Sequence, residues 1–482
     1  MRTDLLIGGA WVSGDGRDRA PVSNPATGEI IAEVEVATET DVAAAVDAAA
    51  GPGADALEAM PVFERARLLH VVADAIDARA DELARQLTAE SGKPLAGETV
   101  GEIEESAEIF RWAAEEAKRL ETPTLPGADP NKRVLTFRKP NGVYALITPW
   151  NFPANIPAEL LAPALAGGNP VVFKPSEETP LTGASLMEII LEAGFPPEAL
   201  SLVHGRGDVG AALVTHPRVD GIGFVGSERT AEAIVRAAGL KRTLIEASGN
   251  GPQIVCDDAD LAAAAEAAVF GAIYAGGQCC VATERLLVQE SVHDELVELV
   301  LAEAAKVRLG DPLDAATTLG PLNNEAVAAK MDAHVADARE RGATVLTGGA
   351  RAGGHPTNLY YPVTVVDGVS TEMLAFREET FGPILPVTTF ADDDEAIALA
   401  NDSHLGLQAA VFTSSLKRAF RYVDRLRMGS IVVNDTTDFW EPHPPFGGAS
   451  RTRTGWGRIG GKYTLLDMTD LRTAVIDVEK CN

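Results

Sequence analysis

Val143-Tyr144-Ala145-Leu146-Ile147 and Pro170-Val171-Val172-Phe173 are two short apolar runs, and a segment of helical character follows each of them. We expect these helices to begin near Pro157 and Leu181. Three similar runs follow, at residues 200–204, 221–225 and 243–245. Short β-branched runs that alternate with helices predict a parallel, doubly wound sheet in an α/β, Rossmann-like domain.

The alternation begins again at Asp257, where a helix is predicted to run to Tyr274. A strand at 285–288 and helices at 292–307 and 324–341 follow, and then apolar runs at 384–390, 409–413 and 430–434. This second series predicts a second α/β unit.

The flanking segments have a different character. Helical apolar spacing occurs at 41–50, 65–86 and 98–120, and a Pro-rich break follows at 122–130. Residues 132–139 alternate like an exposed strand, and 471–478 form a final strand without an obvious sequential partner. Such a tail is suited to adding to the sheet of another subunit.

Composition limits the classes of function. A chain of 482 residues with 46% apolar residues forms two or three domains, and its net charge of -29 argues against a nucleic-acid partner. No apolar run has membrane-spanning length, and the first residues do not resemble a signal peptide, so we expect a cytoplasmic protein without a membrane partner. The four cysteines form no CxxC pair and the histidines show no metal spacing, so we predict a reducing compartment and no metal site.

Two adjacent cysteines lie in Gly276-Gly277-Gln278-Cys279-Cys280-Val281-Ala282. A thiolate attacks aldehydes well and leaves well afterwards, and the glycines let the backbone bring amides near a reacting oxygen. Attack on an aldehyde creates an alkoxide that needs hydrogen-bond donors, and the side-chain amide of Asn151 is one candidate. Glu246 follows an apolar run, at the end of a predicted strand where α/β sites are built, and is a candidate base.

Two stretches match the G-x-G-x-x-G pattern of dinucleotide-binding proteins, at 205–210 and at 221–226. By the motif alone, Glu246 would hold the cofactor ribose, because it lies twenty residues after Gly226. A single match to this pattern is weak evidence, so the motif leaves the choice between the two roles of Glu246 open.

Six ordered stretches resemble the aldehyde dehydrogenase superfamily: 148–153, 173–177, 226–231, 246–252, 276–282 and 378–383. The resemblance runs from Asn24 to the final strand. It implies a coenzyme domain (1–121 and 142–248), a catalytic domain (249–450) and a bridging, oligomerising β arm (122–141 and 465–482). It also implies a homodimer or homotetramer. The variants at 250–252, 284–285 and 458–461 look like the benzaldehyde and vanillin dehydrogenase branch.

The resemblance also implies roles for individual residues. Cys280 is the nucleophile, Glu246 is the base that activates water, and Asn151 with the Cys280 amide holds the oxyanion. The pyrophosphate of NAD lies at Gly226 and Ser227, so the ribose role of Glu246 is rejected. The remaining cofactor residues are Trp150, Lys174, Glu177, Glu379 and Phe381. Glu177 favours NAD, with NADP as an alternative cofactor.

The sequence gives the least information about which aldehyde is the substrate. Phe152, Cys279, Val281, Phe439, Trp440 and His443 are predicted to line its tunnel and favour an aromatic aldehyde. Arg111, Arg451 and Arg453 would instead suit a small acidic aldehyde, such as a semialdehyde or a phosphonoaldehyde. Two further readings stay open: a coenzyme-A-acylating enzyme of the same fold, and a non-catalytic binding or structural relative. The segment 449–456 matches no pattern of the family.

Overall fold

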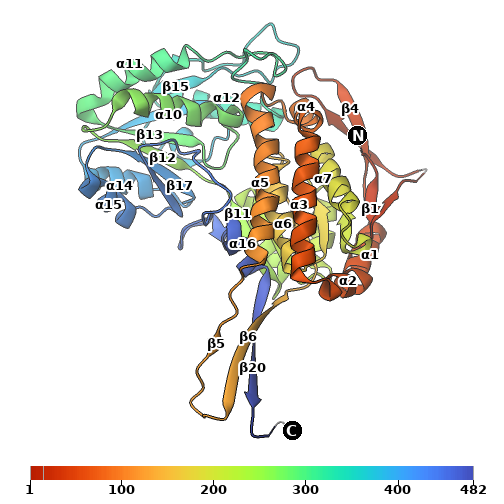
Figure 1. Cartoon of the computed structure of the whole chain (residues 1–482). Helices are drawn as coiled ribbons and strands as arrows, with labels where there is room; N and C mark the ends of the chain where they lie inside the picture. The colour runs from red at the N-terminus through yellow and green to blue at the C-terminus, as the bar shows by residue number, and fades with distance from the viewer. Residues whose placement is uncertain (1, 15, 481–482) are drawn as a thin grey trace.

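The predicted doubly wound sheet is present in the computed structural model, which describes residues 2–14 and 16–480 (Figure 1). The sheet has eight strands. In spatial order they are β19 (Gly455–Trp456), β11 (Arg242–Ala247), β10 (Gly221–Gly226), β7 (Tyr144–Ile147), β8 (Val171–Lys174), β9 (Leu200–Leu202), β1 (Leu5–Ile7) and β2 (Ala10–Val12). The strands from β11 to β9 are parallel, and strand order reverses between β7 and β10. Such a reversal is where α/β sheets bind ligands.

Helices cover both faces of this sheet because its central strands are apolar on both sides. One apolar cluster joins the sheet to α3 (Val62–Ala78), α4 (Ala80–Ser91), α5 (Val100–Ala117), α6 (Asn155–Gly167) and α7 (Pro180–Glu192). A second joins it to α1 (Glu39–Ala48), α8 (Gly207–Thr215) and α9 (Glu228–Ala238). The short helices α2 (Ala54–Ala59) and α16 (Gly461–Asp467) pack at the margins.

The second α/β unit contains a seven-stranded sheet. Its spatial order is β14 (Thr344–Thr347), β15 (Thr364–Asp367), β16 (Ile384–Phe390), β13 (Thr283–Gln289), β12 (Gly251–Val255), β17 (Gln408–Phe412) and β18 (Ser430–Val433). All neighbours are parallel except β14 and β15. One face packs on α10 (Leu261–Ile273) and α11 (His293–Ala304), and the other on α12 (Glu325–Glu340), α13 (Leu374–Arg377), α14 (Asp393–Asn401) and α15 (Leu416–Arg425).

A three-stranded arm projects away from both sheets (Figure 1). It consists of β5 (Thr124–Leu125), β6 (Lys132–Pro140) and β20 (Thr469–Asp477). The final strand therefore has a partner within its own chain, because β20 pairs antiparallel with β6 along its whole length. A separate ribbon of β3 (Arg19–Ser23) and β4 (Ile30–Glu35) lies near the N-terminus.

The structure corrects one expectation about a local element and places one segment for which no element was predicted. The helix expected at 65–86 is two helices, because Arg79 leaves the helical conformation (φ −112°, ψ 13°) between α3 and α4. The segment 449–456, which matched no pattern, contributes β19 to the edge of the first sheet beside β11. In the described part of the chain, no helix combines the length and apolar character needed to cross a bilayer.

Candidate active site

The candidate site lies where the parallel strands of the first sheet end. The loop after β7 carries Trp150, Asn151 and Phe152, β8 ends at Lys174, β10 ends at Gly226 and β11 carries Glu246. From the second unit, the turn between α10 and β13 brings Cys280 to the same place. Side chains from both units therefore share one cavity of about 600 Å³, which we call the cleft.

Cys280 is the point at which two cavities meet. It lines the cleft and also a second cavity of about 370 Å³, which we call the chamber. Cys279 lines only the chamber and is 4% exposed. A hydrogen bond with Cys279, burial and the charge of Glu246 raise the pKa of the Cys280 thiol. Of the two cysteines, Cys280 is the one that two separate molecules can approach at once.

Glu246 is buried at the end of β11, in the wall of the cleft. Its Oε1 atom has no hydrogen-bond partner. Burial and the nearby charge of Glu379 raise the pKa of Glu246 well above that of a free glutamate. A carboxylate with a raised pKa is a stronger base than that of a free glutamate, and it is better able to take a proton from water.

Asn151 is buried beside the cysteine turn. Its Nδ2 donates a hydrogen bond to the carbonyl oxygen of Gln278 (2.8 Å), which fixes the amide next to the backbone that leads into Cys280. The Gln278 side chain is itself held, since its Oε1 accepts from the Asn323 backbone (2.9 Å). Asn151 and Cys280 both line the cleft.

Gly249 allows the two units to meet closely. A Cβ atom at this position would lie 1.9 Å from the backbone oxygen of Cys280. The preceding Ser248 has a positive φ of 67°, so the chain turns sharply after Glu246. Strained backbone of this kind is maintained at functional sites by the surrounding contacts. Gly249 is therefore the residue that this close contact with Cys280 requires.

The residues predicted to hold a dinucleotide line the cleft. Gly226 and Ser227 lie at the start of α9, where backbone N–H groups favour a phosphate. Trp150 and Phe381 form an edge-to-face pair with ring centroids 5.5 Å apart. Glu379 accepts a hydrogen bond from the Gly249 backbone (2.9 Å). These residues fit a dinucleotide, because they supply phosphate, ring and hydroxyl partners along one cavity.

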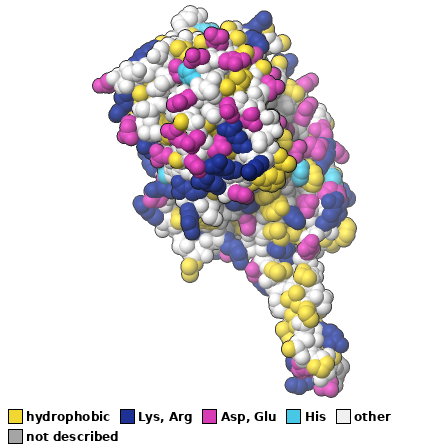
Figure 2. Space-filling view, turned by 90° about the vertical axis from the view of Figure 1, so that its left-hand side faces the viewer, with side chains coloured by type: hydrophobic (Ala, Val, Ile, Leu, Met, Phe, Trp, Pro, Cys, Tyr) yellow, Lys and Arg dark blue, Asp and Glu magenta, His cyan; other side chains and the backbone are white. Residues whose placement is uncertain are grey.

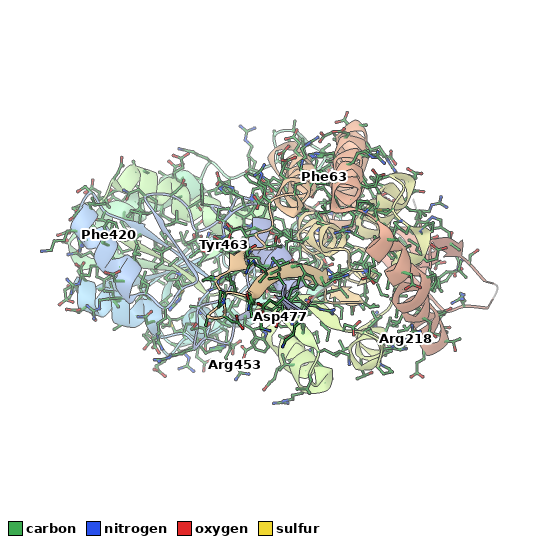
Figure 3. All side chains as sticks on the ribbon, turned by 60° about the horizontal axis from the view of Figure 1, so that its bottom comes forward. Phe63, Arg218, Phe420, Arg453, Tyr463 and Asp477 are labelled. Carbon is green, nitrogen blue, oxygen red and sulfur yellow. The ribbon has the colours of Figure 1, made fainter. Side chains whose placement is uncertain are left out.

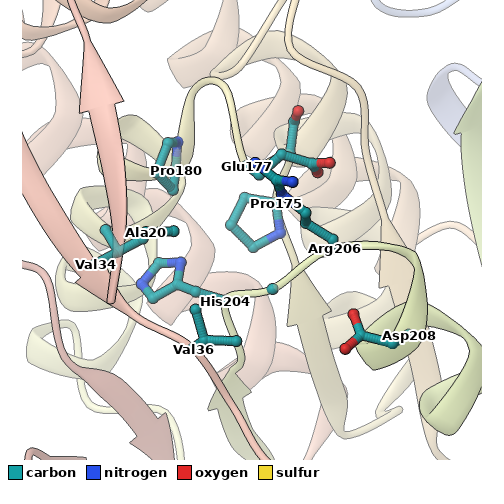
Figure 4. Close-up of a pocket in the computed structure, with 11 residues that line it drawn as sticks. Ala20, Val34, Val36, Pro175, Glu177, Pro180, His204, Arg206 and Asp208 are labelled. Atoms are coloured by element: carbon teal, nitrogen blue, oxygen red, sulfur yellow. The ribbon is translucent and has the colours of Figure 1, made fainter. Parts of the chain in front are cut away.

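Glu177 also lines the cleft, whereas Lys174 is buried and is not among the residues of its wall. Lys174 Nζ lies 3.7 Å from Glu177 Oε2 and donates a hydrogen bond to the Pro175 carbonyl oxygen (3.1 Å). Beside Glu177 is a smaller cavity of about 110 Å³ with His204 and Arg206 in its wall (Figure 4). The first G-x-G-x-x-G stretch, at 205–210, therefore borders this small cavity, and the second, at 221–226, ends in the cleft.

The chamber contains most of the predicted substrate residues. Phe152, Cys279, Val281, Phe439 and Trp440 line it. His443 does not line it and instead stacks on Trp112, with centroids 4.9 Å apart.

The three arginines suggested for an acidic substrate do not reach the chamber. Arg111 pairs with Asp74, Asp77 and Glu108. Arg453 pairs with Glu228 on α9 and lies at the periphery of the molecule (Figure 3). Arg451 is exposed, with a positive φ of 69°. Ion pairing and position on the surface therefore separate these side chains from Cys280.

Several site residues were not found by sequence reasoning. Glu105 and Glu159 line the chamber. Glu284 accepts hydrogen bonds from the backbones of Thr380 and Phe381 (2.8 and 2.9 Å) and so positions the loop of Glu379. The sequence contained one indication that Glu159 has a special position: it is the only charged residue of α6, whose other residues are mostly apolar.

Glu102 positions the loop that carries Asn151, which gives a stability prediction. Its Oε1 accepts from the backbones of Ala154 (2.9 Å) and Asn155 (3.2 Å), and it pairs with buried Lys93. We expect Glu102→Ala to lower the free energy of unfolding by about 3–5 kcal/mol, because a buried ammonium loses its partner. Denaturant titration measures this, with exposed Glu104→Ala on the same helix as control. Equal midpoints for the two variants would contradict the assignment.

Comparison with known proteins agrees with this geometry. Residues 11–474 match the model of the aldehyde dehydrogenase family. The chain is 38% identical to a glutarate-semialdehyde dehydrogenase of Pseudomonas aeruginosa, over 98% of this chain and 97% of that protein. It is also 38% identical to an NADP+-dependent succinate-semialdehyde dehydrogenase of Escherichia coli, over 98% and 97% of the two chains.

A solved structure of a known aldehyde dehydrogenase has the same fold as this chain. The NAD-dependent aldehyde dehydrogenase of Sinorhizobium meliloti superposes with a TM-score of 0.95 at 37% identity, over 100% of this chain and 96% of that one. Together with the family match, this establishes both the fold and the class of enzyme. The chain belongs to the aldehyde dehydrogenase family and is an NAD(P)+-dependent oxidoreductase that acts on an aldehyde.

Proposed function

We propose that the chain converts its aldehyde to a carboxylic acid through a covalent intermediate on Cys280. The observation that carries this proposal is the position of Cys280 in the walls of both the cleft and the chamber. The aldehyde approaches from the chamber and the cofactor occupies the cleft. Ile156 also lines both cavities, but its side chain is a hydrocarbon, so Cys280 is the nucleophile among the described residues that both cavities share.

The steps follow from the residues around Cys280. The thiolate adds to the carbonyl carbon, and the Asn151 amide with the Cys280 backbone N–H stabilises the resulting oxyanion. When bound, the nicotinamide ring supplies the acceptor for the hydride that leaves this carbon. The thioester that remains on Cys280 is attacked by water, whose proton passes to Glu246. Collapse of the tetrahedral adduct releases the carboxylic acid and regenerates the thiolate.

We assign the adenosine end of the cofactor to Lys174 and Glu177. The Glu177 carboxylate favours a ribose with a free 2′-hydroxyl and disfavours a 2′-phosphate by charge repulsion. NAD+ is therefore the expected cofactor. Arg206 in the adjoining cavity is the counter-charge that would admit NADP+ if Glu177 turns aside.

The proposed function and the coenzyme-A-acylating alternative differ in what releases the acyl group, whereas a non-catalytic relative would form none. We expect NADH to accumulate steadily from an aldehyde panel without coenzyme A, with the free acid as product, because Glu246 is present to activate water. NADH absorbance and product analysis with and without coenzyme A measure this. A strict requirement for coenzyme A would support the acylating reading. Absence of turnover with every aldehyde would support a non-catalytic relative.

For the substrate, the chamber supports an aldehyde with an apolar or aromatic body. Six aromatic side chains line it: Phe152, Phe270, Tyr274, Phe439, Trp440 and Phe446. The second candidate is a small acidic aldehyde, which the names of the two relatives favour. None of the described residues that line the chamber is a lysine or an arginine, so the cavity offers an acidic end group no direct ion pair.

The arm supports assembly into a homodimer or homotetramer. Leucine, phenylalanine, valine and isoleucine side chains are exposed along it (Figure 2), namely Leu135, Phe137, Leu471, Val475, Ile476 and Val478. Apolar side chains on a projecting ribbon are suited to packing against a second copy. The described cysteines Cys256, Cys279 and Cys280 form no disulfide, which supports a reducing compartment, the cytoplasm. Cys481 lies outside the described residues.

A further inference from the structure

The chamber has an acidic wall that the reaction does not use. Asn155 and Glu159 lie one turn apart on the same face of α6, and Glu105 reaches them from α5. Asn155 Nδ2 donates to Glu105 Oε2 (2.9 Å). Asp438 adds a third carboxyl group to the lining. Three carboxyl groups are thus placed around one cavity that leads to Cys280.

Three hydrogen-bond acceptor atoms in this wall have no donor. Glu159 is 8% exposed and Asn155 is 7% exposed. The atoms Glu159 Oε1, Asn155 Oδ1 and Asp438 Oδ1 are buried and make no hydrogen bond. Buried acceptors without donors are costly, so such atoms indicate a group that arrives with N–H or O–H bonds. The Asn155 oxygen is not acidic, but it also lacks a donor, so it too indicates a ligand that brings N–H or O–H groups.

The charged side chains around the chamber indicate the chemical class of the group that would bind there. The buried cation Lys93 is paired with Glu102 and lies 4.1 Å over the ring of Phe152. Burial, together with the charge of Glu102, raises the pKa of Glu105 to about 7, and Lys93 offsets only part of this rise. Burial and the charge of Glu105 raise the pKa of Glu159 to about 8. A cation that enters the chamber would favour the ionised forms and would also contact the aromatic faces.

We propose that the chamber selects aldehydes that carry an ammonium group, with Glu105, Asn155 and Glu159 receiving its N–H donors. This inference rests on the proposed function, because it places the carbonyl at Cys280 and the charged end against α6. It departs from the names of the relatives, whose semialdehyde substrates carry a negative end group. The selected substrate class is therefore a short amino aldehyde.

A series of matched substrates tests the proposal with the intact enzyme and NAD+. The substrates are 3-aminopropanal, its uncharged isostere butanal, 3-hydroxypropanal, and succinic semialdehyde as the anion. We expect kcat/KM for 3-aminopropanal to exceed that for each of the others by about tenfold or more, as a desolvated cation contact gives. NADH absorbance measures all four rates.

A matched pair of variants tests the assigned residues. Glu159→Gln keeps the size of the side chain and removes its charge, and we expect it to reduce the ratio of kcat/KM for 3-aminopropanal to that for butanal about tenfold. Exposed Glu104→Gln on α5 is the control and should leave this ratio unchanged. A ratio that Glu159→Gln does not change would overturn the assignment.

The outcomes separate the two proposals. Equal or faster oxidation of butanal, 3-hydroxypropanal or succinic semialdehyde would overturn the selection of cations and leave the aldehyde-oxidising function in place. Failure of all four substrates, and of the aromatic aldehydes in the panel, would instead overturn the proposed function itself.

Discussion

The Cys280→Ala variant is expected to form no NADH burst and to lose steady-state activity by roughly 10⁴- to 10⁶-fold, the range seen when a covalent nucleophile is removed. The sulfur makes the bond to the substrate, so no thioester can form without it. Stopped-flow absorbance at the NADH band measures the burst. Because alanine removes only one atom at the junction of two cavities, the fold and cofactor binding are expected to be retained.

The neighbouring cysteine provides the matched control. Cys279→Ala should retain a burst of one equivalent of NADH, because Cys279 lines only the chamber. A full burst in Cys280→Ala that disappears in Cys279→Ala would show that the assignment of the nucleophile is reversed. The family resemblance decided between two adjacent thiols, so this pair of variants tests it directly.

The Glu246→Gln variant is expected to give a burst of NADH followed by turnover reduced about 10²- to 10⁴-fold, as loss of a general base does. The amide has the shape of the carboxyl group but cannot take a proton from water, so the thioester forms and then accumulates. Rapid-quench measurement of enzyme-bound acyl groups detects it. The affinity for NAD+ should be unchanged.

The pH dependence gives an independent check on Glu246. Its pKa is raised by burial and by Glu379, and only the ionised form acts as a base. The steady-state rate of the wild type should therefore rise as the pH increases through this raised pKa, above the range in which a free glutamate titrates, and this rise should be absent in Glu246→Gln. Weakened NAD+ binding with normal release of the acid would instead favour the ribose role that the G-x-G-x-x-G spacing suggested.

The pattern of the sequence was sufficient for the architecture. The short apolar runs at 143–147, 170–173 and 221–225 are strands of a parallel sheet, as predicted. Burial on both faces demands a continuous apolar run, and this signal is local and strong. Among the strands that were not predicted, β2 and β19 are short edge strands whose residues carry no such signal. β1 and β12 lie inside their sheets, but β1 has only three residues and β12 begins with Gly251 and Pro252, which are typical of turns.

The partner of the final strand could not be predicted for a different reason. β20 is separated from β6 by more than 300 residues, and strand pairing over that distance leaves no mark in either segment. Both segments alternate as exposed strands do, which predicts that each is a strand and says nothing about which strand it pairs with.

For the site, sequence alone determined which residue types are candidates: a thiol, a carboxyl group and an amide in motifs whose spacing resembles one enzyme family. Only the tertiary structure decided that Cys280 faces two cavities, that Arg111, Arg451 and Arg453 are elsewhere, and that Glu105 and Glu159 line the chamber. The physical reason is that motifs record local backbone geometry, whereas the lining of a cavity is set by how separate helices and loops pack. A glutamate in a helix has the same sequence signature whether it faces water or an empty chamber.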